Sequence, residues 1–312
     1  MTPAIEFTGV TKRYRAVDAL RNVTFSVAPG EMFGLIGPDG AGKTTAIRTI
    51  CGLSHIDSGT IRVLGQDPVK NHRAITGTVG YLSQRFTLYG DLSIDENIAF
   101  FAEIHGVSDY RRRRDRLLEM TQLTPFRARL ADQLSGGMKQ KLALACTLVH
   151  EPKVILLDEP TTGVDPVSRR EFWKLLSQFL AQGITIVMST PYLDEAERCS
   201  RIVLLHEGQV LALDEPGALR ASLPGTLLEV LVASPSTALD ALKGPGGAKH
   251  VQVFGDRLHV WSRASTAAAA EAEFTAMAAR AGVQPEGVRT IVPSLEDVFI
   301  AKLDSSTETP AS

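Results

Sequence analysis

A glycine-rich loop followed by a lysine and two threonines is the stretch of this 312-residue chain best suited to chemistry. Its glycines allow backbone N–H groups to point inward and bind a polyanion, aided by the positive end of the following helix dipole. Lys43 would reach the terminal phosphates, and the Thr44 hydroxyl would ligate Mg²⁺. The pattern G-x-x-x-x-G-K-[ST] predicts a nucleoside triphosphate site, the alternative being a glycine-rich turn that happens to carry a lysine. This phosphate loop consists of Gly37, Pro38, Asp39, Gly40, Ala41, Gly42, Lys43, Thr44 and Thr45.

Two neighbouring carboxylates, Asp158 and Glu159, follow the apolar run Val154–Leu157. If that run is a parallel strand, both carboxylates lie at its carboxyl end, where open α/β sheets bind their ligands. Asp158 would hold Mg²⁺ through its water shell, and Glu159 would polarise the attacking water as general base.

A third candidate element is Leu134–Lys141, in which Ser135, Gly136 and Gly137 open a helix. A hydroxyl and backbone N–H groups would then face outward from a positive helix end. In an isolated chain the same residues need be no more than a helix cap.

The elements that must position these residues are those of an α/β domain. Met32–Ile36 before the phosphate loop, Val154–Leu157 and Ile184–Met188 are continuous apolar runs typical of parallel strands covered on both faces. Alternation between Ile5 and Val27 predicts half-buried antiparallel strands. Helical periodicity, with Ser93 and Glu96 as a capping box, predicts a helical insertion at about residues 85–140.

Beyond a boundary near Leu223, the predicted elements follow the order β-α-β-β-α-β, which indicates a small α+β (ferredoxin-like) domain. Ser294 and Asp297 are placed to cap a last helix. We therefore predict three parts: a nucleotide-binding domain at 1–223, an accessory domain at 224–304 and a disordered tail at 305–312.

Composition restricts the function classes. Lys and Arg total 33 against 35 Asp and Glu, and the net charge of −2 disfavours nucleic-acid binding. The run Arg111–Arg114 lies among acidic residues and predicts a solvated helix face, the alternative being a nucleic-acid or membrane contact. The chain has no apolar run of about 18 residues and no signal-peptide pattern at its start. Its three separated cysteines, Cys51, Cys146 and Cys199, are expected to be structural.

Together these motifs identify a family resemblance, because Leu134–Lys141 is similar to the signature of the ABC (ATP-binding cassette) superfamily. The resemblance implies an ABC-type phosphate-loop NTPase fold with an antiparallel subdomain and a helical insertion, with ATP and Mg²⁺ as cofactors. It also implies that Ser135 faces the ATP of a second cassette. Since the chain has one signature and one phosphate loop, we expect a homodimer or a heterodimer.

Three further site residues follow from the family pattern alone. Tyr14 matches the aromatic residue that stacks on adenine, with core packing as the alternative. Gln84 matches the glutamine that touches Mg²⁺ and water and connects the site to the helical insertion. Asp165 matches a loop that crosses the dimer interface, with a turn aspartate as the alternative.

One position departs from the family pattern. After Ile184–Met188 the family usually carries a histidine that hydrogen-bonds the γ-phosphate, and alignment of the following residues places Pro191 there. Proline has no N–H to donate. We therefore expect slow hydrolysis, or a partner cassette that supplies a complete second site.

The subgroup follows from two stretches. Gln133–Asp165 is similar to ATPase subunits of ABC-2 type exporters, and Pro293–Ile300 resembles the closing motif of daunorubicin-resistance-type multidrug exporters. The resemblance implies an ATP-hydrolysing motor that binds a separate ABC-2 type permease at the cytoplasmic face of the plasma (inner) membrane. We expect no nucleic-acid partner. The alternatives are a regulatory or soluble ABC ATPase with weak hydrolysis, and an importer ATPase.

Overall fold

The computed structural model describes residues 2–85, 88–243 and 251–307, and it divides into two compact units, Met1–Glu215 and Pro216–Ser312. The division comes before α8 (Pro216–Ala221) and not near Leu223, because α8 packs on α11 (Leu295–Thr307). α11 also takes in residues 305–307 of the expected disordered tail. The rest of that tail, 308–312, lies outside the described residues.

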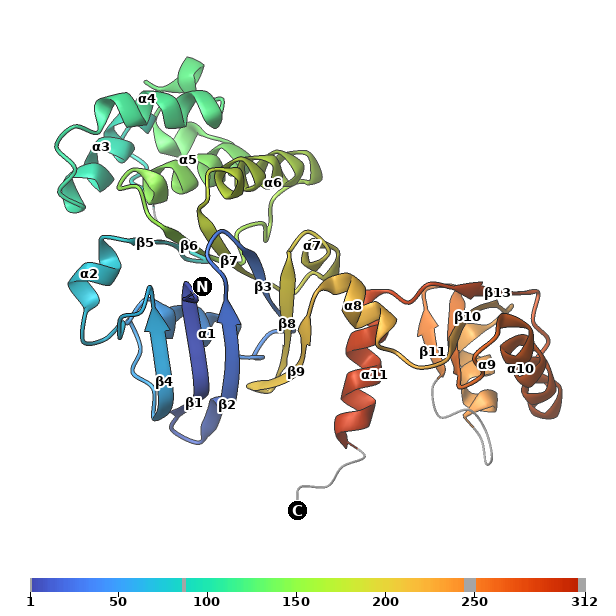
Figure 1. The fold of residues 1–312 in the computed structure, drawn as a ribbon. Coiled ribbons are helices and arrows are strands. Elements are labelled where there is room, and N and C mark those ends of the chain that lie inside the picture. Colours follow the sequence, from blue (N-terminus) through green and yellow to red (C-terminus); the bar gives the residue numbers. More distant parts are fainter. Residues whose placement is uncertain (1, 86–87, 244–250, 308–312) are drawn as a thin grey trace. The chain divides into compact units, whose positions relative to one another are not determined.

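A six-stranded sheet forms the centre of the first unit (Figure 1). Its first five strands are parallel, and the last pairs antiparallel with its neighbour in the predicted hairpin. Every residue of the third and sixth strands of the chain is buried, which explains their uninterrupted apolar sequences. The strands, in sheet order, are β5 (Val79–Leu82), β6 (Val154–Asp158), β7 (Thr185–Thr190), β3 (Met32–Ile36), β8 (Arg201–His206) and β9 (Gln209–Asp214).

A smaller antiparallel sheet packs beside the central sheet, as the alternating N-terminal pattern predicts. Its strand order is β2 (Val17–Val27), β1 (Ile5–Tyr14), β4 (Ser58–Val63). Three stacked rings join the two sheets, with centroids 4.4 Å apart for Phe7 and Phe25 and 5.4 Å apart for Phe25 and Phe33. The antiparallel subdomain therefore shares one core with the central sheet.

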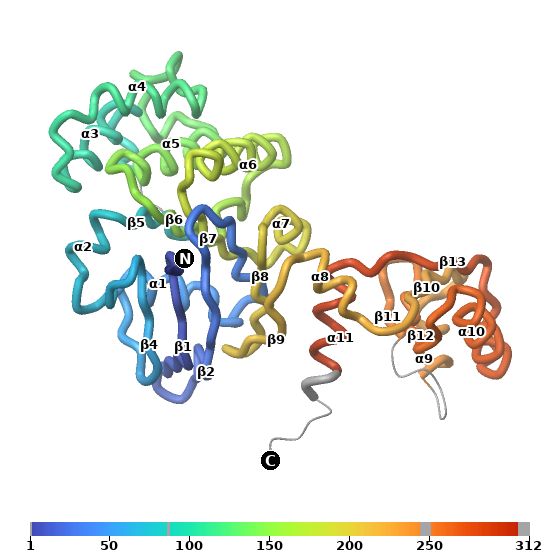
Figure 2. Tube along the Cα trace, in the orientation of Figure 1, coloured from blue at the N-terminus to red at the C-terminus, as the bar shows by residue number. Residues whose placement is uncertain are grey.

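The helical insertion leaves the core after β5 and returns at β6, as the green segment of Figure 2 shows. The predicted capping box is present at its first helix, where Ser93 N donates to Glu96 Oε2 at 2.8 Å and Glu96 N to Ser93 Oγ at 3.3 Å. The insertion contains α3 (Ile94–Ile104), α4 (Arg111–Met120), η1 (Thr124–Phe126), η2 (Ala131–Gln133) and α5 (Gly136–Leu148). The other helices of this unit are α1 (Lys43–Ile50), α2 (His72–Thr76), α6 (Pro166–Ala181) and α7 (Leu193–Ala196).

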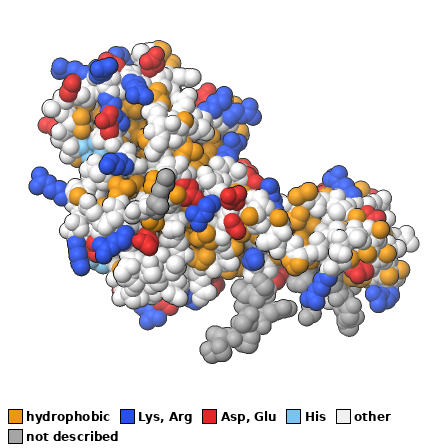
Figure 3. All heavy atoms as spheres, viewed as in Figure 1, with side chains coloured by type: hydrophobic (Ala, Val, Ile, Leu, Met, Phe, Trp, Pro, Cys, Tyr) orange, Lys and Arg blue, Asp and Glu red, His pale blue; other side chains and the backbone are white. Residues whose placement is uncertain are grey.

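The arginine run Arg111–Arg114 is only half solvated. Its first two side chains are exposed, and charges of both signs are interspersed over the insertion (Figure 3). Arg113 Nε, however, donates to the Leu148 carbonyl at 2.9 Å, and Arg114 pairs with Asp95 at 3.4 Å. The expectation of a fully solvated face was wrong for these two, because they bridge α4 to neighbouring segments.

The second unit has the predicted β-α-β-β-α-β order. Its antiparallel sheet has the order β11 (Val251–Phe254), β12 (Arg257–Ser262), β10 (Thr226–Leu231), β13 (Gly287–Ile291). Helices α9 (Pro235–Leu242) and α10 (Ala267–Ala281) share a core with one face of this sheet. The predicted cap of α11 is also present, since Ser294 N donates to Asp297 Oδ2 at 2.8 Å.

The role of the cysteines and the lack of a membrane-spanning run were also predicted from the sequence. Cys51, Cys146 and Cys199 are buried and free, and burial raises the pKa of each thiol. Within the described ranges, each helix is too short or too polar to cross a membrane.

Candidate functional site

The phosphate loop joins β3 to α1 and requires glycine at two positions. A Cβ at Gly37 would collide with the Leu205 carbonyl oxygen, and one at Gly42 with the Ala19 carbonyl oxygen. Gly42 also has a φ of 102°. Among the described residues no side chain caps α1, so the N–H groups of its first turn are available to a bound anion.

Lys43 is held over this loop with 4% of its surface exposed. Its Nζ donates to the carbonyl oxygens of Gly37 at 2.8 Å and Pro38 at 3.0 Å, and it lies 3.2 Å from Glu159 Oε1. The loop thus fixes a buried ammonium group where phosphates would enter.

Asp158 is joined to the loop through Thr44, whose Oγ1 donates to Asp158 Oδ1 at 3.0 Å. The sequence did not indicate Ser189, which donates to the same oxygen at 2.7 Å and accepts from Glu159 N at 3.0 Å. Ser189 pairs with Asp158 in the parallel register of β6 and β7, and this pairing is the feature that could have revealed it. The described ranges contain no group of three His, Cys, Asp or Glu side chains suited to a metal. The hydroxyl and carboxylate oxygens of Thr44 and Asp158 nevertheless fit Mg²⁺, which needs few protein ligands when phosphates supply the others.

Glu159 occupies the centre of the site with an unusual backbone. Its φ of 49° is in the left-handed region, which costs a non-glycine residue roughly 1–3 kcal/mol. Gln84 Nε2 donates to its Oε2 at 2.9 Å, while Lys43 lies at its other oxygen. The structure therefore brings together Lys43, Gln84 and Glu159, three of the residues that the sequence places at the site.

Another buried carboxylate near the site, Glu195, was also missed. It is 1% exposed and accepts from Thr161 Oγ1 at 2.6 Å and from Thr190 Oγ1 at 2.7 Å. These bonds tie the loop after β6 to the end of β7. Tyr192 N donates to Thr190 Oγ1 at 3.1 Å, so the turn around Pro191 is fixed on both sides.

The remaining predicted residues lie at helix ends. Ser135 is exposed, and its Oγ accepts from Met138 N at 3.3 Å to cap α5. Asp165 caps α6 by accepting from the backbone N–H groups of Val167 at 3.1 Å and Ser168 at 3.0 Å, and the bonds from Ser168 lower the pKa of its carboxyl. In the described part of the chain, the polar contacts of both side chains stay within these caps.

Tyr14 is 44% exposed, so core packing does not account for it. Its hydroxyl lies 2.9 Å from Ser54 Oγ, and Lys12 Nζ lies 5.0 Å from its ring centroid. The ring is accessible at the surface, and adenine stacking stays a prediction.

Comparisons with known proteins give a consistent set of relatives. A family model described as ABC transporter matches residues 20–162. The chain is 47% identical over 235 residues, 74% of its length, to the probable multidrug ABC transporter ATP-binding protein YbhF of Escherichia coli (strain K12), and spans only 40% of that relative. It is 40% identical over 243 residues to the Nod factor export ATP-binding protein I of Paraburkholderia xenovorans (strain LB400), covering 77% of this chain and 80% of the relative. A solved structure of a dimeric bacterial ABC transporter cassette is 28% identical, with a TM-score of 0.61, and covers 68% of this chain and 98% of that one.

Proposed function

The chain belongs to the family of ABC transporter ATP-binding proteins, and from this premise we propose that it is the ATP-hydrolysing motor subunit of an ABC-2 type exporter. The observation that carries the proposal is the buried cluster of Lys43, Glu159 and Gln84 at the phosphate loop, in a chain whose Ser135 is exposed. The names of two relatives, a multidrug ABC transporter ATP-binding protein and a Nod factor export ATP-binding protein, support export as the process that is driven.

Nucleotide would be held by the uncapped first turn of α1 and by Lys43, which already faces the loop carbonyls. Mg²⁺ would be held by Thr44, Asp158 and the carbonyl oxygen of Gln84, whose amide nitrogen is occupied by Glu159. The ion neutralises charge on the phosphate oxygens.

Glu159 would accept a proton from the attacking water as general base. Two contacts orient its carboxylate, one with Lys43 and one with Gln84, so it needs little reorganisation before the reaction. Ser189 positions the segment by binding both the Asp158 carboxylate and the Glu159 backbone N–H.

A second cassette would complete the site. Ser135 and Asp165 are exposed and meet only their own helix ends in the described chain, so they are free to contact a nucleotide bound to another copy. The similar dimeric cassette structure supports this arrangement. ATP would close the dimer, and hydrolysis would reopen it.

The membrane partner would be a separate permease, with this chain on the cytoplasmic face of the membrane. Gln84 directly precedes the segment that leads to α3, so nucleotide-dependent movement at Glu159 can pass into the helical insertion. Pro191 favours one alternative, a subunit that binds ATP and hydrolyses it weakly, because a donor to the γ-phosphate is absent at that position.

The test is dimerisation by a variant that binds ATP without hydrolysing it. Glu159→Gln keeps the hydrogen-bonding shape but removes the base, so light scattering should show a dimer that depends on ATP and Mg²⁺. The matched control Lys43→Ala should remain monomeric. A Glu159→Gln protein that stays monomeric with ATP and Mg²⁺ would contradict the motor proposal, and failure to co-purify with a multi-span membrane subunit would favour the non-transport alternatives.

A further inference from the structure

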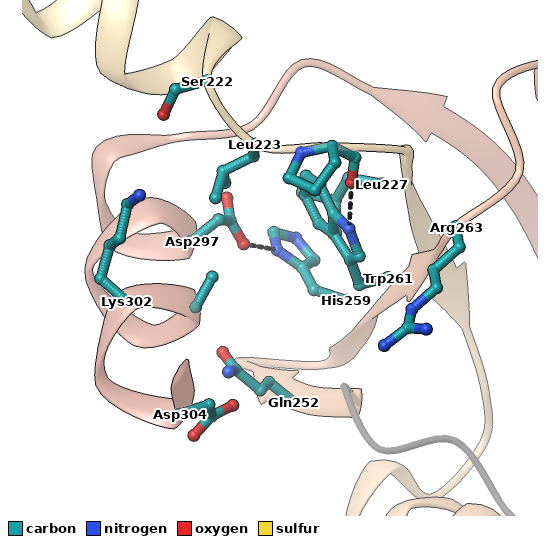
Figure 4. A pocket seen from close by; sticks show the side chains of 12 residues that line it. Ser222, Leu223, Leu227, Gln252, His259, Trp261, Arg263, Asp297, Lys302 and Asp304 are labelled. Carbon is teal, nitrogen blue, oxygen red and sulfur yellow. Dashed lines mark hydrogen bonds and ion pairs between the residues drawn. The ribbon is translucent and has the colours of Figure 1, made fainter. Parts of the chain in front are cut away.

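The second unit contains a cavity of about 340 Å³ between one face of its sheet and α11 (Figure 4). Side chains alternate along β12, so Leu258 and Val260 enter the core beneath α9 and α10, whereas His259 and Trp261 line the cavity on the other face. A volume of this size lies within the range of small-molecule sites.

Trp261 supplies a fixed aromatic wall. Its indole N–H donates to the Pro224 carbonyl oxygen at 2.6 Å, so its one polar group is already satisfied. What it offers the cavity is therefore ring surface, next to the apolar side chains of Leu223 and Leu227. Such a wall favours a flat apolar ligand.

His259 supplies a ring nitrogen that can form a hydrogen bond with a ligand. Its Nδ1 lies 2.7 Å from Asp297 Oδ1, and its ring stacks on Phe254 with centroids 4.0 Å apart. Burial opposes ionisation of Asp297, but hydrogen bonds from His259 and Ser294 outweigh it and lower the pKa of this carboxyl. An ionised Asp297 accepts from Nδ1–H, which leaves the second ring nitrogen, Nε2, without a hydrogen-bond partner among the described residues.

Arg263 supplies an uncompensated positive charge. The two other arginines of this sheet, Arg257 and Arg289, both bind Glu229, whereas Arg263 has no carboxylate partner among the described residues. Arg263 follows β12 in the same alternation as His259 and Trp261, so Trp261 lies between the imidazole and the cation. A guanidinium binds a carboxylate through two parallel hydrogen bonds.

We propose that this cavity, the Trp261 pocket, binds a planar aromatic carboxylate that also carries a hydroxyl group. The ring packs against Trp261, the hydroxyl forms a hydrogen bond with His259 Nε2, and the carboxylate pairs with Arg263. The site lies entirely within the second unit and does not depend on ATP hydrolysis, so its success or failure is separable from that of the motor proposal.

Binding of para-hydroxybenzoate to the full-length protein is the test. The chain has two tryptophans, so Trp173→Phe leaves Trp261 as the only one, and its fluorescence reports occupancy of the pocket. Calorimetry on the unmodified chain gives a second measurement. We expect saturable binding by both methods, with benzoate and phenol each binding about tenfold more weakly because each lacks one polar contact.

Two arginine variants give the matched comparison. Arg263→Gln should weaken binding of para-hydroxybenzoate at least about tenfold. Arg280→Gln, which removes a charge from α10 outside the pocket, should leave the affinity unchanged. Absence of saturable binding up to about 10 mM would overturn the proposal, as would equal affinities of the two variants or of the three ligands.

Discussion

The two halves of the predicted ATP site differ in how far a single chain completes them. On the phosphate-loop side, Lys43, Gln84 and Glu159 are joined within one chain by contacts of 2.9 to 3.2 Å. On the signature side, Ser135 and Asp165 are exposed, and within the described residues the polar contacts of their side chains stay at their own helix ends. The difference indicates that the first half is preorganised, whereas the second half gains its function only from another chain.

The largest expected effect tests this division directly. Lys43→Ala and Ser135→Ala should each lower the ATPase rate, by on the order of 100-fold for the lysine, because each removes a donor to phosphate. A mixture of the two variants should recover about one quarter of the wild-type rate, since half of the dimers are mixed and each of these has one intact site.

Steady-state ATPase assays of the separate and mixed proteins give the measurement. If the mixture is no more active than its components, Ser135 acts within its own chain. The signature side would then not depend on a second chain. Mixing Lys43→Ala with Glu159→Gln serves as the negative control, because both residues lie on the phosphate-loop side and the mixed dimers keep no intact site.

The next effect concerns Pro191, which lies at the edge of the preorganised half. Pro191→His should raise the ATPase rate on the order of 100-fold, because the imidazole adds a donor to the transferring phosphate. A rate that is unchanged or lower, measured beside the wild type, would count against Pro191 as the cause of slow hydrolysis. Tyr192→Phe is a control, since it alters the same turn without adding a donor to phosphate.

A buried helix cap in the second unit sharpens the comparison with the exposed cap at Asp165. Asp297→Asn should lower the free energy of unfolding at neutral pH by about 2 kcal/mol, because Asp297 accepts hydrogen bonds from both His259 and Ser294. The folded-state pKa of Asp297 is lowered, so this stabilisation is present above the usual carboxyl pKa and is lost as the pH falls through the folded value.

Urea unfolding of wild type and variant between neutral pH and about pH 3 provides the measurement, since the usual carboxyl pKa is near 4. The difference in free energy of unfolding between wild type and Asp297→Asn should become smaller as the pH falls toward 3. A difference that does not change with pH would mean that the charge of the Asp297 carboxylate does not stabilise this unit.

The smallest effect separates the two roles of Asp165. Asp165→Ala should lower stability by about 1 kcal/mol through loss of the α6 cap, whereas Asp165→Asn keeps a capping oxygen and should restore most of it. If the carboxylate also acts across the dimer interface, the ATPase rate stays reduced in Asp165→Asn. Full activity in that variant would reduce Asp165 to a helix cap.

Local patterns predicted the strands, the capping boxes and the phosphate loop, because each depends on residues close in sequence. Ser189 escaped prediction because its partner Asp158 lies about 30 residues away and only the parallel register of β6 and β7 brings the two together. Glu195 was missed because its partner Thr161 also lies about 30 residues away, in the loop after β6. The structural roles of Arg113 and Arg114 were missed for the same reason. The Trp261 pocket likewise requires α11 to fold back on β12, which no local pattern specifies.

The three native cysteines have a practical consequence. Each thiol is buried with a raised pKa, so little reactive thiolate is exposed at neutral pH. The native cysteines should therefore react little with thiol-directed probes. A probe attached to the cysteine of Ser135→Cys could then follow the opening and closing of the cassettes in real time.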